Sequence, residues 1–139
     1  MARQNAVAVV AEDQEFWRSG ISSMLRRQLG FGKVVQTINF EQLLQALEAE
    51  PDPALVTIDL ELPGLQRHLG LREVRTRYPS ARVVVITAQA DRETILLSLS
   101  AGSHGFIPKR MQAAEIQAAL ALVMVGCIFV PPDFPELPE

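Results

Sequence analysis

The chain has 139 residues, 48% of them hydrophobic, which is the size of one domain with one hydrophobic core. Thirteen basic and sixteen acidic residues give a net charge of −3, so bulk electrostatics does not draw DNA or RNA to this chain. The N-terminus reaches acidic residues too early for a signal peptide, and the apolar stretch near the C-terminus is too short to cross a bilayer, so no membrane contact is expected. The single cysteine, Cys127, is predicted to be a small buried side chain in a reducing compartment, which favours a cytoplasmic location.

Short β-rich runs alternate with helical patterns along the whole chain. The predicted strands cover residues 6–11, 33–38, 54–58, 82–87 and 104–108. Apolar side chains at helical spacing predict helices around 17–25, from a cap at Asn39 to Pro51, less regularly over 65–78, around 95–99, and over 116–123. This alternation predicts an α/β fold in which helices cover both faces of a parallel sheet. The last nine residues contain four prolines and no apolar periodicity, so an extended, solvated tail is expected there.

Polar groups collect at the predicted ends of four strands. Glu12 and Asp13 follow the first strand, Asp59 follows the third, Thr87 ends the fourth, and Lys109 follows the fifth. Because parallel strands open at one edge of a sheet, these groups should converge there. Three neighbouring carboxylates repel one another unless a cation neutralises them, and hard oxygen ligands suit Mg²⁺. Each group alone has an ordinary explanation, such as acids at a helix start, but their joint placement favours a phosphoryl-transfer site.

With these groups in this order, the chain resembles the receiver domain of bacterial two-component response regulators over nearly its whole length. The motifs that carry the resemblance are "ED" at 12–13, "DLELPG" at 59–64, "VVVITA" at 83–88 and "GFIPK" at 105–109. The segments "EDQEFWRSGI", "RYPSARVVVITA", "AGSHGFIPKR" and "GCIFVPP" are similar to the NarL/FixJ-like subfamily, whose members normally carry a LuxR-type helix-turn-helix output domain.

The resemblance implies a flavodoxin-like (βα)5 doubly wound parallel sheet with strand order 2-1-3-4-5. It implies a response regulator receiver domain over residues 1–130 and a proline-rich linker stub over 131–139, with the output domain absent. DNA would then be bound only through that absent domain, to regulate transcription, and a homodimer is permitted.

The resemblance also implies a mechanism. Asp59 would be the phosphoacceptor for a sensor histidine kinase, and Lys109 and Thr87 would contact the transferred group. The implied Mg²⁺ ligands are Glu12, Asp13, Asp59 and the backbone carbonyl of Glu61. Thr87 and Phe106 would act as the switch and alter the face formed by the fourth helix, the fifth strand and the fifth helix. The chain would be no enzyme beyond Mg²⁺-dependent phosphorylation and dephosphorylation of itself.

Some positions depart from the commonest receiver pattern. Glu12 is longer than the usual aspartate, Phe106 replaces a frequent tyrosine, and Gln66 and Arg67 stand where Asp-Gly is common, which leaves the loop before the third helix open. A flavodoxin-type binding module is disfavoured because the acidic "AEDQEF" would repel a phosphate after the first strand. An aspartyl phosphatase would place its Asp-x-Asp motif after the first strand, whereas the motif here follows the third. A receiver-like interaction module that works without phosphorylation is the remaining alternative.

Three further features have simple interpretations. His68 and His104 lack a metal-ligand spacing and are expected to be surface or loop residues. Trp17 is expected to pack within the first helix. The fourth helix carries more leucine than one buried stripe requires, which indicates a contact surface around residues 96 and 97.

Overall fold

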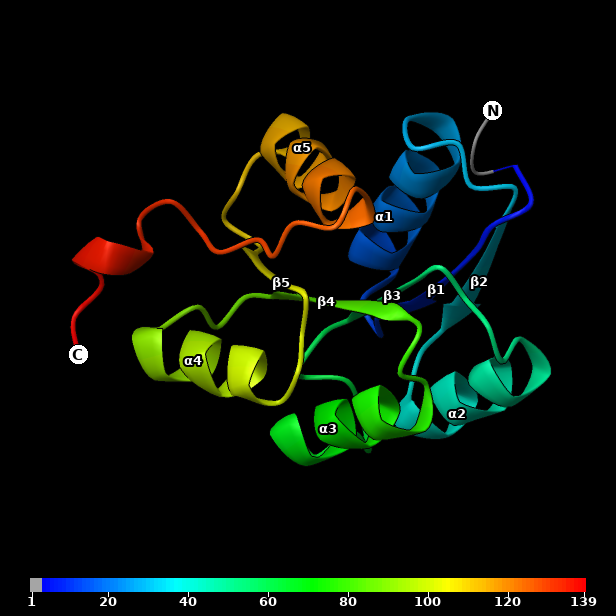
Figure 1. Cartoon of the computed structure of the whole chain (residues 1–139), viewed down its shortest axis with the longest axis horizontal. Helices are drawn as coiled ribbons and strands as arrows, with labels where there is room; N and C mark the ends of the chain where they lie inside the picture. The colour runs from blue at the N-terminus through cyan, green and yellow to red at the C-terminus, as the bar shows by residue number, and fades with distance from the viewer. Residues whose placement is uncertain (1–3) are drawn as a thin grey trace.

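The computed structural model describes residues 4–139 as one parallel sheet with helices on both faces (Figure 1). The strands are β1 (Val7–Ala11), β2 (Lys33–Thr37), β3 (Leu55–Ile58), β4 (Arg82–Thr87) and β5 (Gly105–Pro108). The helices are α1 (Glu15–Arg27), α2 (Phe40–Ala49), α3 (His68–Arg77), α4 (Arg92–Ser100), α5 (Ala113–Met124) and the short 3-10 helix η1 (Phe134–Glu136). Residues 1–3 of the expected receiver domain lie outside the described residues.

The strand order is β2-β1-β3-β4-β5, and all neighbouring strands are parallel. This confirms the flavodoxin-like doubly wound fold, and the observed strands agree with the predicted ones to within one residue at each end. Between residues 4 and 139, no helix is both long and apolar enough to span a membrane.

Side chains of the central strands alternate between two hydrophobic clusters, one on each face of the sheet. Val9, Val56 and Val85 pack toward α2, α3 and α4, whereas Val10 and Val84 pack toward α1 and α5. Figure 1 shows the same division, with α1 and α5 on one side of the sheet and α2, α3 and α4 on the other. Strands buried on both faces are typical of parallel sheets, so the reactive groups at their ends have a rigid support.

Local sequence signals account for the starts of two helices. The predicted cap of α2 is confirmed, because Asn39 Oδ1 accepts a hydrogen bond from the backbone N–H of Gln42 at 2.8 Å. Helix α3 starts at His68, three residues later than predicted. The reason is that Gln66 and Arg67 adopt positive φ angles of 58° and 50°, which are uncommon for residues other than glycine. The loop before α3, whose conformation the sequence did not predict, is therefore strained.

The C-terminal segment corrects two predictions. The tail is not extended throughout: it forms η1, and Phe134 and Leu137 are half-buried against the hydrophobic cluster next to α4, although most of the other tail residues are exposed as predicted. Prolines stop an α-helix, but they leave the apolar residues between them free to pack. Cys127 is exposed rather than buried. The chain turns at Gly126, where φ is 102°, and it is Phe129 that then reaches β5.

Candidate functional site

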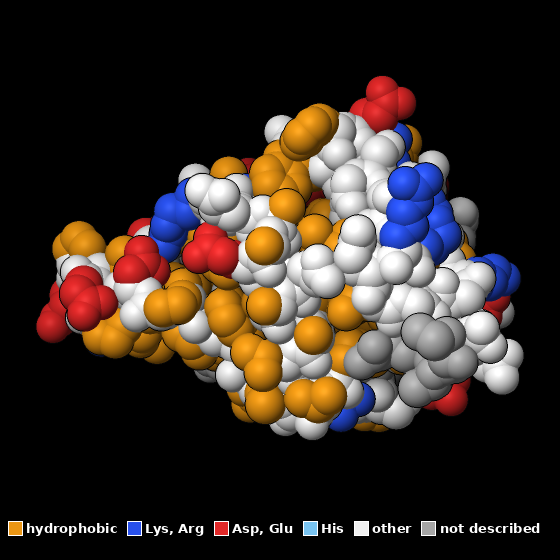
Figure 2. Space-filling view, turned by 90° about the horizontal axis from the view of Figure 1, so that it is seen from above, with side chains coloured by type: hydrophobic (Ala, Val, Ile, Leu, Met, Phe, Trp, Pro, Cys, Tyr) orange, Lys and Arg blue, Asp and Glu red, His pale blue; other side chains and the backbone are white. Residues whose placement is uncertain are grey.

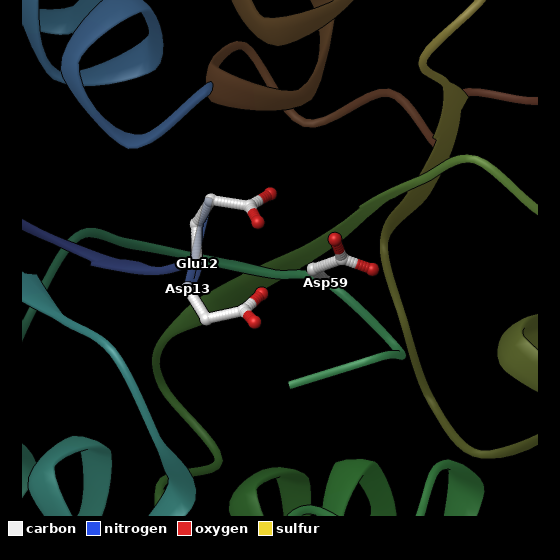
Figure 3. Close-up of side chains that lie close together, drawn as sticks. All are labelled: Glu12, Asp13 and Asp59. Carbon is white, nitrogen blue, oxygen red and sulfur yellow. The ribbon is translucent and has the colours of Figure 1, made fainter. Parts of the chain in front are cut away.

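The carboxyl ends of the strands bring the predicted acids together. Figure 3 shows Glu12, Asp13 and Asp59 gathered where the neighbouring strands β1 and β3 end. One carboxylate oxygen from each of the three lies within 4.8 Å of the other two. Glu12 and Asp59 are buried, whereas Asp13 is exposed. The cluster therefore has a closed inner side and one side open to solvent.

Both carboxylate oxygens of Asp59 have specific partners. Oδ1 accepts a hydrogen bond from the Thr87 hydroxyl at 2.7 Å and from the backbone N–H of Glu61 at 3.0 Å. Oδ2 accepts a hydrogen bond from Lys109 Nζ at 2.8 Å. The backbone N–H of Asp59 donates to the carbonyl of Ala11, which extends the pairing of β3 with β1. The predicted acceptor, hydroxyl and ammonium thus lie in direct contact.

Lys109 is surrounded by groups from two strand ends and from the start of one helix. Its Nζ lies 2.8 Å from Glu12 Oε1 as well as from Asp59, and it donates to Gln14 Oε1 at 3.0 Å. The ammonium also lies 5.1 Å from the centre of the Trp17 ring, a cation–π distance. Sequence reasoning missed the contacts of Gln14 and Trp17, because a glutamine and an aromatic residue at the start of an amphipathic helix are ordinary in a single sequence.

These contacts set the charge states of the site. Burial by itself would raise the pKa of Asp59, but the Glu61 N–H, Lys109 and Thr87 together hold that pKa below its ordinary value. For Glu12 burial outweighs the ion pair, and the pKa is raised. Burial would lower the pKa of Lys109, but the two carboxylates raise it above its ordinary value. Asp59 is therefore an ionised carboxylate beside a charged ammonium.

The donor set suits a hard divalent cation. All three groups offer carboxylate oxygens, and the buried Glu12 Oε1 accepts no hydrogen bond from residues 4–139, although Lys109 Nζ is near. The Glu61 carboxylate turns away and pairs with Arg67 Nη1 at 2.5 Å. A contribution from the Glu61 backbone carbonyl stays a prediction.

The remaining predicted residues occupy distinct places. Phe106 is fully buried in the cluster that faces α4, so its predicted rotation stays a prediction. His104 lies in the loop before β5, as predicted, and is half-buried, with its Nδ1 accepting a hydrogen bond from the Val83 N–H at 3.0 Å. His68 is half-buried at the start of α3, and its Nε2 lies 3.1 Å from Ser98 Oγ. The extra leucines of α4, Leu96 and Leu97, are 49% and 45% exposed.

The comparison with known proteins agrees with this geometry. The family model described as "Response regulator receiver domain" matches residues 8–121. The chain belongs to this family. A structure of a two-component response regulator of the LuxR family from Aurantimonas sp. aligns to this receiver with a TM-score of 0.85 at 23% identity. That alignment covers 95% of this chain and 94% of the other.

Relatives of this receiver include longer regulators. The "Glycerol metabolism activator" of Pseudomonas putida is 26% identical over 90% of this chain. The "Nitrate/nitrite response regulator protein NarL" of Escherichia coli K12 is 25% identical over 89% of it. The aligned part makes up 57% of each of these two relatives. The chain thus spans only part of the length of the relatives it matches.

Proposed function

We propose that this receiver accepts a phosphoryl group on Asp59 from a sensor histidine kinase and transmits the change to the face formed by α4, β5 and α5. One observation carries the proposal. Asp59, at the end of a buried strand, is an ionised carboxylate whose two oxygens contact the Thr87 hydroxyl at 2.7 Å and the Lys109 ammonium at 2.8 Å. A nucleophile so held, with one donor and one cation beside it, suits phosphoryl transfer.

The transfer itself is a displacement at phosphorus. A carboxylate oxygen of Asp59 forms the new P–O bond, the P–N bond to the kinase histidine breaks, and its electron pair returns to the imidazole. Lys109 and the Thr87 hydroxyl would then bond oxygens of the phosphoryl group instead of the carboxylate. Because Thr87 ends β4 and Lys109 follows β5, this exchange of partners pulls on the loop that leads to α4 and on the loop that leads to α5.

Glu12, Asp13 and Asp59 would hold Mg²⁺, with the Glu61 backbone carbonyl as a further ligand. Such an ion supplies positive charge that offsets the charge of the transferring group. In its absence the Lys109 ammonium is the cation nearest to both buried acids, at 2.8 Å from each. The receiver would react only at its own Asp59, through phosphorylation and dephosphorylation, and would not turn over other substrates.

The remaining expectations concern the whole protein. Residues 1–130 would form the receiver and 131–139 the start of a linker to a helix-turn-helix domain, by which the longer protein would regulate transcription in the cytoplasm. A homodimer has a second candidate surface on α1 and α5. Figure 2 looks onto this side and shows hydrophobic side chains gathered over its middle, and Phe16 and Leu122 of these helices are 81% and 46% exposed.

Intact mass measured after incubation with acetyl phosphate and Mg²⁺ tests the proposal. We expect one added phosphoryl group in the wild-type chain and none in Asp59→Asn. Asp52→Asn, which changes an exposed aspartate in the α2–β3 connection, is the matched control and should be labelled like the wild type. An unchanged wild-type mass, under conditions that label a known receiver, would instead support the interaction module that works without phosphorylation.

A further inference from the structure

The face formed by α4, β5 and α5 is partly covered by the chain's own C-terminal segment. Residues 129–137, which we call the strap, follow the turn after α5. In Figure 1 this segment leaves α5, passes β5 and ends on the side of α4. The face proposed above for signal output therefore already has an occupant.

The strap begins by pairing with the edge of the sheet. The N–H of Phe129 donates to the carbonyl of His104, and the N–H of Phe106 donates to the carbonyl of Phe129, both at 3.0 Å. The strap packs closely here, since a Cβ at Gly105 would lie 3.4 Å from Phe129 Cβ, an ordinary van der Waals distance. The edge strand β5, together with the predicted switch residue Phe106, is thus bonded directly to the strap.

Two arginines hold the distal half of the strap. Arg92, the first residue of α4, donates from Nη1 to the carbonyl of Phe134 at 3.3 Å, and its guanidinium lies 4.6 Å from the centre of the Phe134 ring. Arg110 Nη2 contacts both carboxylate oxygens of Asp133, at 2.9 and 2.7 Å. Leu137 packs against the hydrophobic cluster beside them. Exposed ion pairs of this kind are individually weak, so the strap is held by a sum of small contacts and can be released by a small displacement.

Each arginine anchor follows, along the chain, one of the two residues whose side chains contact Asp59. Arg110 directly follows Lys109, and Arg92 starts the helix that follows the Thr87 loop. We propose that the strap is a built-in ligand of the α4, β5 and α5 face, and that modification of Asp59 releases it so that a partner can bind there. The release of the strap by modification of Asp59 rests on the function proposed above, whereas the docking of the strap does not.

Part of α4 stays open beside the strap. A hollow of about 460 Å³ is lined by Leu96 and Leu97 together with the last residue, Glu139. A partner could make its first contact with these leucines and complete its binding after the strap has left β5. The strap thus competes for only a part of the binding surface, as a releasable inhibitor requires.

Amide hydrogen exchange of the full chain tests the docking directly. The reporter is the Phe129 amide, which donates to the carbonyl of His104, the residue before β5, only while the strap is docked. Phe134→Ser removes the aromatic anchor and should accelerate exchange at Phe129 by about tenfold, while amides of β3 keep their protection. Phe16→Ser, which removes an 81% exposed phenylalanine from α1, is the matched control and should leave Phe129 unchanged. A wild-type rate at Phe129 in Phe134→Ser would overturn the docking.

A charge exchange and a phosphoryl mimic test the anchor and the trigger. Arg110→Asp should accelerate exchange at Phe129, and adding Asp133→Arg should slow it again; no recovery in the double variant would refute the role of this ion pair.

Beryllium fluoride with Mg²⁺ should accelerate exchange at Phe129 in the wild type but not in Asp59→Asn. If the intact mass shows a phosphorylated Asp59 and exchange at Phe129 does not change, release is refuted. A missing phosphoryl group counts against the proposed function instead, and the Phe134 variant still decides the docking.

Discussion

Replacing Lys109 by methionine would leave two buried carboxylates facing each other without a cation. The Lys109 ammonium lies 2.8 Å from both Glu12 and Asp59, and the exposed fractions of the two acidic side chains are only 2% and 4%. Methionine keeps an apolar stem beside Trp17 but removes the charge. Loss of one partner from a buried ion pair costs about 3–5 kcal/mol, a large part of the roughly 5–15 kcal/mol that stabilises a domain. We expect about 3 kcal/mol at neutral pH without divalent cations, the low end of that range because Glu12 can take up a proton.

The loss should depend on pH and on Mg²⁺ in a defined direction. Burial already raises the pKa of Glu12, and removal of the ammonium raises it further. A carboxyl group whose pKa is raised in the folded state binds more protons there than in the unfolded state. The free energy of unfolding of the variant therefore recovers as the pH falls from neutral through that raised pKa. Mg²⁺ at neutral pH should also restore stability, since it replaces the missing charge.

Urea unfolding with EDTA or with Mg²⁺, at neutral and mildly acidic pH, measures these effects. Lys33→Met is the matched control, because Lys33 forms an exposed ion pair with Glu50 and is itself 60% exposed. That variant should lose at most about 1 kcal/mol relative to the wild type, and this difference should change with neither pH nor Mg²⁺. Equal losses in the two variants, or a Lys109→Met loss that neither Mg²⁺ nor acid reduces, would refute the buried charge balance.

Three further changes follow from the same contacts. Thr87→Val removes a hydroxyl that donates to the Asp59 carboxylate, so it should lower the free energy of unfolding by about 2 kcal/mol in denaturant titrations. Gln66→Gly relieves a positive φ of 58° and should raise the free energy of unfolding by about 1 kcal/mol. His104 must stay neutral at Nδ1 to accept from the Val83 N–H, and burial and neighbouring arginines lower its pKa. As the pH falls, the His104 imidazole is therefore protonated in the unfolded chain before it is protonated in the folded chain. The free energy of unfolding of the wild type should decrease below about pH 6.5, and His104→Asn should make this decrease with pH smaller.

Each of these changes has a control in the same chain. Thr57→Val removes a buried hydroxyl that has no hydrogen-bond partner among residues 4–139, so it should cause no loss; a loss equal to that of Thr87→Val would contradict the charge-assisted bond. Gln45→Gly, on the exposed side of α2, should cost about 1 kcal/mol. A similar cost at Gln66 would mean that the loop carries no strain. Identical pH profiles of the wild type and His104→Asn would contradict the role given to the histidine.

Most of the site could be predicted because it depends on topology. Once the strands are known to be parallel, the residues that follow them must meet at one edge, and Glu12, Asp59, Thr87 and Lys109 do so. Gln14 and Trp17 could not be predicted in the same way. Their contact with Lys109 depends on the angle at which α1 leaves β1, and no local pattern specifies that angle.

By itself the sequence determined the order and type of the elements, the parallel sheet and the acids at its edge, because strand periodicity and helix caps are local properties of the chain. Only the tertiary structure decided the strained loop at Gln66, the exposure of Cys127 and the course of the C-terminal segment. The prolines near the C-terminus correctly excluded an α-helix but carried no information on what Phe134 would contact. Its partners, Arg92 and the cluster beside α4, are distant in sequence, so the packing exists only once the sheet has brought them together.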